Sequence, residues 1–148
     1  MKENLVIQLN SLLADVSVMY FKAHNLHWNV IGRQFVTIHT YLEEFYNELA
    51  GTIDEVAELM KKFGVYPKAS MKEYLKVSSI VELESKDVSV TEVLTILEED
   101  INILKNNALK VRVIAAEDDL FEVINTMEDM IESYSKTLWF IKSMNKSN

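Results

Sequence analysis

The chain has 148 residues, of which 49% are hydrophobic and 26% charged, with one proline, three glycines and no cysteine. This length fits one domain with its own core, and the missing cysteines exclude disulfide frameworks, thiolate nucleophiles and cysteine-ligated zinc. A formal net charge of −8 disfavours nucleic-acid phosphate as a partner and favours cations as ligands.

Four amphipathic helices are predicted, because apolar residues recur at alternating steps of three and four along four segments. Gly32 and Gly64 follow the first two segments, and we expect these glycines to end the first and second helices. Short connections after the first and third helices predict antiparallel hairpins. The four stripes run over residues 5–30, 35–63, 94–115 and 120–141.

Two capping boxes are visible in the sequence. Ser89-Val90-Thr91-Glu92 is predicted to open the third long helix, and Ser70-Met71-Lys72-Glu73 to open a short helix before it. Asp118 or Asp119 is expected to cap the fourth long helix.

The connection between Gly64 and Ser89 is too long for a hairpin, which predicts a crossover. Such a connection lets the second and third long helices run parallel, and one long crossover in a four-helix bundle is the ferritin-like arrangement. We therefore predict an all-α, ferritin-like four-helix bundle with a short helix in the crossover, as a single domain over residues 1–148. The sequence shows no signal peptide and no membrane span, so a cytoplasmic protein is expected.

All three histidines, His24, His27 and His39, lie near the predicted junction of the first two helices. A single histidine near a helix end is more often a packing or capping residue than a metal ligand. His39 and Glu43 are, however, four residues apart and share one helix face. Imidazole together with carboxylate suits iron, manganese and zinc.

Asp54 and Glu58 form a second pair at this spacing, but His39 and Asp54 lie about 22 Å apart along a helix axis. They could share an ion only if two copies of the helix pack antiparallel about a two-fold axis near Tyr46 and Asn47. The sequence contains no Glu-x-x-His motif, and the interior stripes read as wholly apolar. A metal site is therefore expected between subunits and not in the bundle core.

The segment His24-Asn25-Leu26-His27-Trp28-Asn29-Val30-Ile31-Gly32, followed by His39 and Glu43, resembles the signature of the Dps family of mini-ferritins. Asp54-Glu55-Val56-Ala57-Glu58 is similar to the family's second signature, Asp-x-x-Ala-Glu. The resemblance spans essentially the whole chain. It implies a hollow dodecamer with ferroxidase activity, which oxidises Fe(II), usually with hydrogen peroxide, and stores Fe(III).

The resemblance also implies a di-iron site between two-fold-related subunits. His27 and His39 of one subunit would bind iron with Asp54 and Glu58 of the other, and Glu58 would bridge the two ions. Glu43 would hold the second iron directly or through water.

Three acidic residues open the fourth helix, and the resemblance implies an acidic three-fold pore near that element. An acidic pore would attract Fe(II), although helix capping explains the same residues. They are Asp118, Asp119 and Glu122.

The sequence leaves two alternative functions. A DNA-compacting protein needs a basic tail, but the amino terminus lacks one, residues 142–148 hold two lysines, and twelve chains at −8 would carry −96. Direct DNA binding is therefore not expected. A bundle that binds zinc or manganese without redox turnover is the second alternative.

Overall fold

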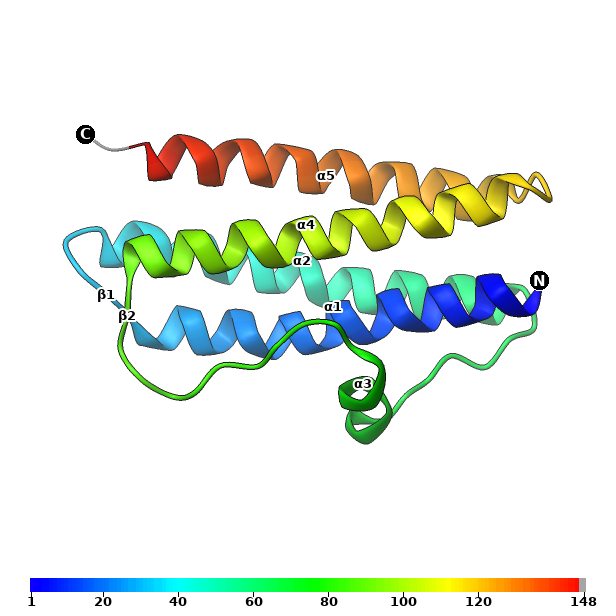
Figure 1. Ribbon diagram of the computed structural model, residues 1–148, viewed down its shortest axis with the longest axis horizontal. Coiled ribbons are helices and arrows are strands. Elements are labelled where there is room, and N and C mark those ends of the chain that lie inside the picture. Colours follow the sequence, from blue (N-terminus) through cyan, green and yellow to red (C-terminus); the bar gives the residue numbers. More distant parts are fainter. Residues whose placement is uncertain (147–148) are drawn as a thin grey trace.

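The structure is a computed structural model that describes residues 1–146. The predicted domain (residues 1–148) and the lysine-containing end (residues 142–148) both include Ser147 and Asn148, which lie outside the described residues. Four long helices lie side by side in an elongated bundle, and a short helix sits in the crossover (Figure 1). α2 and α4 run in the same direction and α1 and α5 in the opposite one, as predicted. The helices are α1 (Glu3–Asn29), α2 (Phe35–Lys62), α3 (Met71–Val77), α4 (Val90–Ala116) and α5 (Phe121–Asn145).

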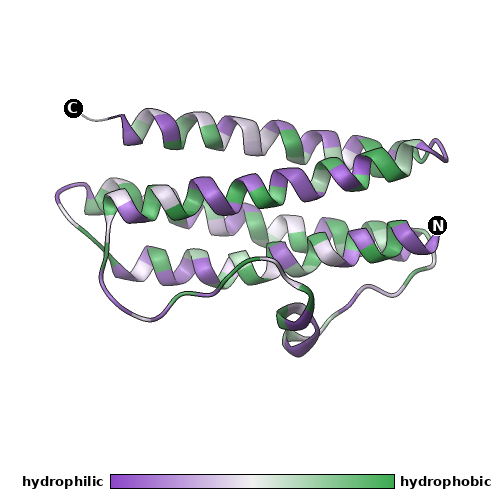
Figure 2. Ribbon diagram, in the orientation of Figure 1, coloured by the Kyte–Doolittle hydropathy of each residue, from purple (hydrophilic) through white to green (hydrophobic). Residues whose placement is uncertain are grey.

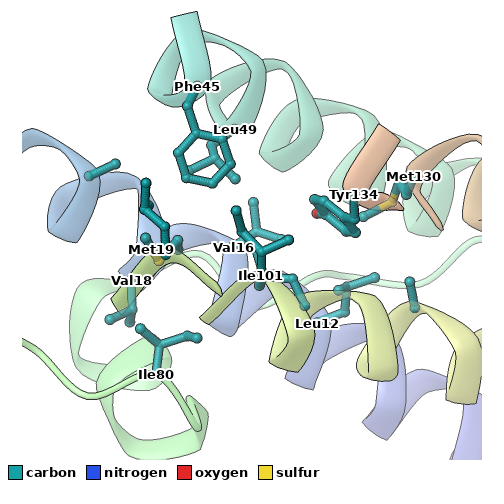
Figure 3. Packing of buried hydrophobic residues seen from close by; sticks show 14 of the residues in the cluster. Leu12, Val16, Val18, Met19, Phe45, Leu49, Ile80, Ile101, Met130 and Tyr134 are labelled. Atoms are coloured by element: carbon teal, nitrogen blue, oxygen red, sulfur yellow. The ribbon is translucent and has the colours of Figure 1, made fainter. Parts of the chain in front are cut away.

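The apolar stripes meet in one core. Every stripe residue of α1 and α4 is buried, whereas in the first half of α5 the buried face is shifted, so that Ile124 is half-buried and Val123 is buried. Figure 2 shows hydrophobic and hydrophilic residues alternating along each long helix. Figure 3 shows side chains of all four long helices packing together, among them Leu12, Val16, Phe45, Leu49, Ile101 and Tyr134.

Within the described residues, α1 alone is long and apolar enough, by length and composition, to cross a membrane. Its most apolar stretch of 18 residues is 61% buried inside the bundle. The apolar character of α1 is therefore accounted for by its packing against α2 and α4.

The predicted capping box at Ser89 forms in full, whereas at Ser70 only the bond to the N-cap hydroxyl forms and the Glu73 carboxylate accepts instead from the Ala69 N–H and the Ser70 hydroxyl. The Ser89 hydroxyl accepts from the Glu92 N–H at 3.2 Å, and the Glu92 carboxylate accepts from the Ser89 N–H at 3.1 Å. The Ser70 hydroxyl accepts from the Glu73 N–H at 3.3 Å and opens α3.

Gly64 ends α2 as expected, in a left-handed conformation with φ of 75°. Its N–H donates to the Lys61 carbonyl at 2.9 Å, and the next N–H, of Val65, donates to Met60 at 3.0 Å. These two bonds are the Schellman pattern of helix ends, which requires a left-handed residue at this point.

The prediction that Asp118 or Asp119 caps the fourth helix is wrong. The residue before α5 is Leu120, and no side-chain cap bond is formed there. Asp119 instead adopts a left-handed φ of 50°, and its N–H donates to Ala116 at 3.3 Å. Asp119 is therefore the left-handed residue that ends α4, as Gly64 is for α2. The Asp118 carboxylate pairs instead with the Lys2 ammonium at 2.8 Å.

A two-residue parallel bridge joins β1 (Val30–Ile31) to β2 (Val88–Ser89). It ties the end of α1 to the end of the crossover. The paired residues lie nearly sixty positions apart in the chain. Two strands of two residues each are too short to show a periodic pattern, so the sequence did not predict this bridge.

The interior is not wholly apolar, which corrects the sequence-based expectation. Asp15 of α1 is fully buried and accepts bonds from the Ser78 hydroxyl at 2.9 Å, the Ser79 N–H at 2.6 Å and the Asn107 amide at 2.9 Å. One carboxylate thus joins α1 to α4 and to the crossover. Because buried polar groups need such partners, these bonds set the position of the crossover on the bundle.

A buried ion pair adds to the polar contacts between α1 and α4, which together we call the polar seam. The Lys22 ammonium lies 2.6 Å from the Asp100 carboxylate, and both side chains are less than a tenth exposed. Gln8, Asp15 and Lys22 are spaced seven residues apart on α1, as Asp100 and Asn107 are on α4. This heptad spacing keeps the polar groups on the line where the two helices face each other.

Candidate metal centre

His27 and His39 come together although twelve positions separate them in the chain. His27 is buried in the last turn of α1, and His39 is half-buried in the second turn of α2. Their rings are stacked, with centroids 3.6 Å apart and planes 13° apart. The hairpin between α1 and α2 creates this contact, because it returns the chain antiparallel at once.

Each of these histidines is fixed by the main chain of the other. The Nδ1–H of His27 donates to the His39 carbonyl at 2.6 Å, and the Nδ1–H of His39 donates to the His27 carbonyl at 2.7 Å. A carbonyl oxygen can only accept, so the neutral form of each ring carries its proton on Nδ1. Nε2 of each ring keeps its lone pair, which is the form that binds metal ions.

Glu43 lies one turn after His39 and is exposed. Its carboxylate accepts a bond from the Tyr46 hydroxyl at 3.3 Å. Partial burial, and then the nearby Glu43 charge, raise the pKa of the Tyr46 hydroxyl. Tyr46 therefore stays protonated at neutral pH and can serve as a donor. The sequence places Tyr46 only near a possible symmetry axis, and no local pattern reveals this contact.

Asp54 and Glu58 lie on α2 far from the histidines and are both exposed. They line a shallow hollow of about 580 Å³ together with Gly51, Lys61 and Lys62. A Cβ at Gly51 would meet nothing within 4 Å apart from its chain neighbours and the backbone of its own helix. Packing within one chain therefore does not explain the glycine at this position.

One chain does not assemble the predicted ligand set. Among residues 1–146, no three histidine, aspartate or glutamate side chains gather closely enough to hold a metal ion. The structure brings His27 and His39 together and leaves Asp54 and Glu58 as a separate pair. The assignment of all five predicted ligands to one centre stays a prediction.

The exposed side of α2 carries the candidate ligands in one line. Glu43, Asn47, Ala50, Asp54 and Glu58 are all exposed and follow at steps of three or four, which places them on one face. A second α2 packed antiparallel on this face would meet small or polar side chains at its centre. The two carboxylates would then approach the histidine end of the partner helix.

Comparison with known proteins identifies the family. A family model for the ferritin-like domain matches residues 7–147. Antigen TpF1 of Treponema pallidum is 31% identical over 134 residues, which cover 90% of this chain and 76% of the relative. A DNA protection during starvation protein of Brevibacillus brevis is 32% identical over 138 residues, which cover 93% and 91%. The chain belongs to the Dps family of mini-ferritins.

Solved structures agree with this assignment to the Dps family. The crystal structure of TpF1 matches with a TM-score of 0.94 and 30% identity, covering 97% of this chain and 92% of that one. A Dps protein from Vibrio cholerae O1 matches with a TM-score of 0.92 and 28% identity, over 97% and 90% of the two chains. That protein is described as a member of a broad superfamily of ferritin-like diiron-carboxylate proteins. The predicted all-α ferritin-like fold and the resemblance to Dps are thereby confirmed.

Proposed function

We propose that this Dps-family chain is a cytoplasmic ferroxidase and iron-storage protein. It would oxidise Fe(II) with hydrogen peroxide and keep Fe(III) inside a hollow dodecamer, which limits oxidative stress and maintains iron homeostasis. The observation that carries the proposal is the reciprocal bonding of His27 and His39, which leaves Nε2 of both rings available for metal.

The proposed centre lies between two subunits. His27 and His39 of one chain, with Glu43 beside them, would face Asp54 and Glu58 of a second chain across an antiparallel pair of α2 helices. The exposed line of residues on α2 supports this arrangement, and so does Gly51, which leaves room for a second backbone. Such an isologous contact forms two equivalent sites in each dimer.

The chemistry follows from holding two Fe(II) ions together. Two ions give both electrons that reduce one hydrogen peroxide, with two protons, to two water molecules, so no hydroxyl radical is released. Carboxylates from Asp54 and Glu58 would offset the added positive charge of Fe(III), and Glu58 would bridge the two ions. The neutral imidazoles orient the ions without adding charge.

The direct test is anaerobic loading with Fe(II) followed by hydrogen peroxide, with ferric absorbance followed on the size-exclusion peak. We expect rapid oxidation and iron retained at the mass of twelve subunits. Glu58→Gln should bring oxidation down to the rate without protein. Glu44→Gln, which changes an exposed carboxylate of the same helix outside the predicted ligand set and outside the hollow lined by Asp54 and Glu58, should oxidise iron like the wild type.

A mixing experiment tests the shared site separately. One variant lacks both histidines (H27A/H39A) and the other lacks both carboxylates (D54A/E58A), and neither should oxidise iron alone. Unfolded together and refolded, the two chains form mixed dimers in which one of the two sites is complete. Random pairing makes half of the dimers mixed, so about a quarter of the wild-type sites should return. Sites contained within one chain would give no recovery.

The same experiments decide between this proposal and the alternatives. A dodecamer that binds zinc or manganese at these ligands but oxidises iron no faster than buffer would leave a non-redox metal-binding protein. The relatives named for DNA protection during starvation do not by themselves require contact with DNA. Removal of Fe(II) and peroxide would protect DNA indirectly.

A further inference from the structure

The histidines of the proposed centre are the middle of a longer aromatic array between α1 and α2. Tyr46 lies against His27 with the ring planes at 84° and the centroids 5.2 Å apart. The ring of Tyr46 also stacks on His24, with centroids 3.8 Å apart and planes 21° apart. One tyrosine ring therefore contacts both His24 and His27.

His24 is itself held in place by its own helix. Its Nδ1 lies 2.8 Å from the Tyr20 carbonyl, to which the Nδ1–H donates. The Tyr20 ring packs edge-on against His24 at 4.7 Å and against Tyr46 at 6.2 Å. These contacts fix the plane of the His24 ring, and stacking on that plane leaves Tyr46 little freedom to rotate.

The orientation of Tyr46 matters because its hydroxyl donates to the exposed Glu43 carboxylate. An exposed glutamate has several rotamers and loses this freedom when it binds an ion. A hydroxyl held at a set point favours one of these rotamers before the ion arrives. The same ring limits the movement of His27.

We infer that His24 and Tyr46 are positioning residues of the proposed metal centre. His24 holds the ring of Tyr46, and Tyr46 in turn orients Glu43 through its hydroxyl and supports His27 through its ring. This inference rests on the proposed function, because Glu43 and His27 are ligands only under that proposal. It gives a role to the one histidine that the predicted ligand set leaves out.

The two contacts of Tyr46 can be removed one at a time. Tyr46→Phe removes the hydroxyl and keeps the ring, while His24→Leu removes the stacked ring and His24→Phe retains one. Tyr41→Phe is the matched control, since Tyr41 is on the same helix and stacks on Phe140 instead. Circular dichroism and size exclusion verify the fold and assembly of each variant.

Co(II) is the probe, because its visible spectrum reports the number and geometry of its ligands as well as its affinity. Tyr46→Phe and His24→Leu should each weaken Co(II) binding by about 10- to 100-fold, as changes in residues that orient metal ligands do. Both should alter the intensity of the visible bands. His24→Phe and Tyr41→Phe should bind like the wild type, and the double variant H24L/Y46F should be no weaker than its weaker single variant.

The possible failures are distinct. A wild-type protein that binds no Co(II) overturns the proposed function and this inference with it. A wild type that binds while Tyr46→Phe and His24→Leu bind equally well, with the same spectrum, overturns this inference alone. His24→Phe that fails as badly as His24→Leu also overturns it, because the imidazole and not the stacked ring would then be required.

Discussion

At the scale of single residues, Asp15 determines how the crossover attaches to the bundle. Its two carboxylate oxygens satisfy three donors, two of them from the crossover and one from α4. The carboxylate is fully buried, so water cannot replace it when it is removed. The free energy of unfolding should therefore depend strongly on this one side chain.

Asp15→Ala should lower the free energy of unfolding by about 3 kcal/mol or more, because buried donors are left without acceptors. Urea unfolding at a fixed protein concentration measures the change. Ser17→Ala is the control, since this buried hydroxyl donates to the Leu13 carbonyl of its own helix, and it should cost at most about 1.5 kcal/mol. Equal losses in the two variants would contradict a special role for Asp15.

At the scale of elements, the beginning of α4 carries a contribution to stability that depends on pH. Bonds from the Ser89 N–H and then from the Ser89 hydroxyl hold the pKa of the Glu92 carboxyl below its usual value of 4.5. The unfolded chain therefore binds a proton more readily than the folded chain does. The stabilisation is complete above the unfolded pKa and is lost as the pH falls through the folded value.

Glu92→Ala should lower the melting temperature at neutral pH, and the difference from the wild type should shrink as the pH falls below 4.5. Melting curves recorded from pH 7 to pH 3 measure it. Thr91→Ala changes the neighbouring exposed residue and should give a difference that does not vary with pH. A wild-type advantage that persists at pH 3 would contradict the capping role of the carboxylate.

The pairing of α1 with α4 depends on the buried ion pair of Lys22 and Asp100. Lys22→Met leaves the Asp100 carboxylate buried without its partner and should cost about 3–5 kcal/mol in the free energy of unfolding. The double variant K22M/D100L replaces both charges by apolar side chains and should recover most or all of this loss. Urea unfolding of the two variants compares them, and a double variant less stable than Lys22→Met would contradict this account.

At the scale of the whole molecule, the proposed activity belongs to the assembly. Each chain offers a histidine pair and a separate carboxylate pair, and neither is a complete centre. Net charge belongs to the same scale, since a formal charge of −8 on every chain adds up in any oligomer. The field of such a particle repels phosphate and attracts Fe(II).

We therefore expect no shift of duplex DNA in a gel, even at low ionic strength where phosphate contacts are strongest. Appending a tail of several lysines should produce a shift that disappears as salt is added, which shows that the assay can detect binding. A salt-sensitive shift by the unmodified protein would contradict the expectation and support the DNA-binding alternative.

The sequence by itself determined the four long helices, the cap residues Ser70 and Ser89 and the ferritin-like topology. These features follow from local periodicity, from cap residues three positions apart and from the length of one connection, all of which are legible along the chain. It also picked out His27, His39, Glu43, Asp54 and Glu58, whose assignment to one centre stays a prediction.

Only the tertiary structure decided what depends on the register between helices. No local pattern encodes which residues of neighbouring helices lie opposite each other. This applies to the reciprocal bonds of His27 and His39, to the bond between Asp15 and Asn107 and to the stacking of His24 on Tyr46. From the sequence, Asp119 is predicted to cap the beginning of the fourth long helix. Its left-handed backbone shows that it ends α4 instead. Each of these contacts exists because packing the apolar stripes sets which turns of neighbouring helices face each other, and polar side chains then bond to whatever lies opposite.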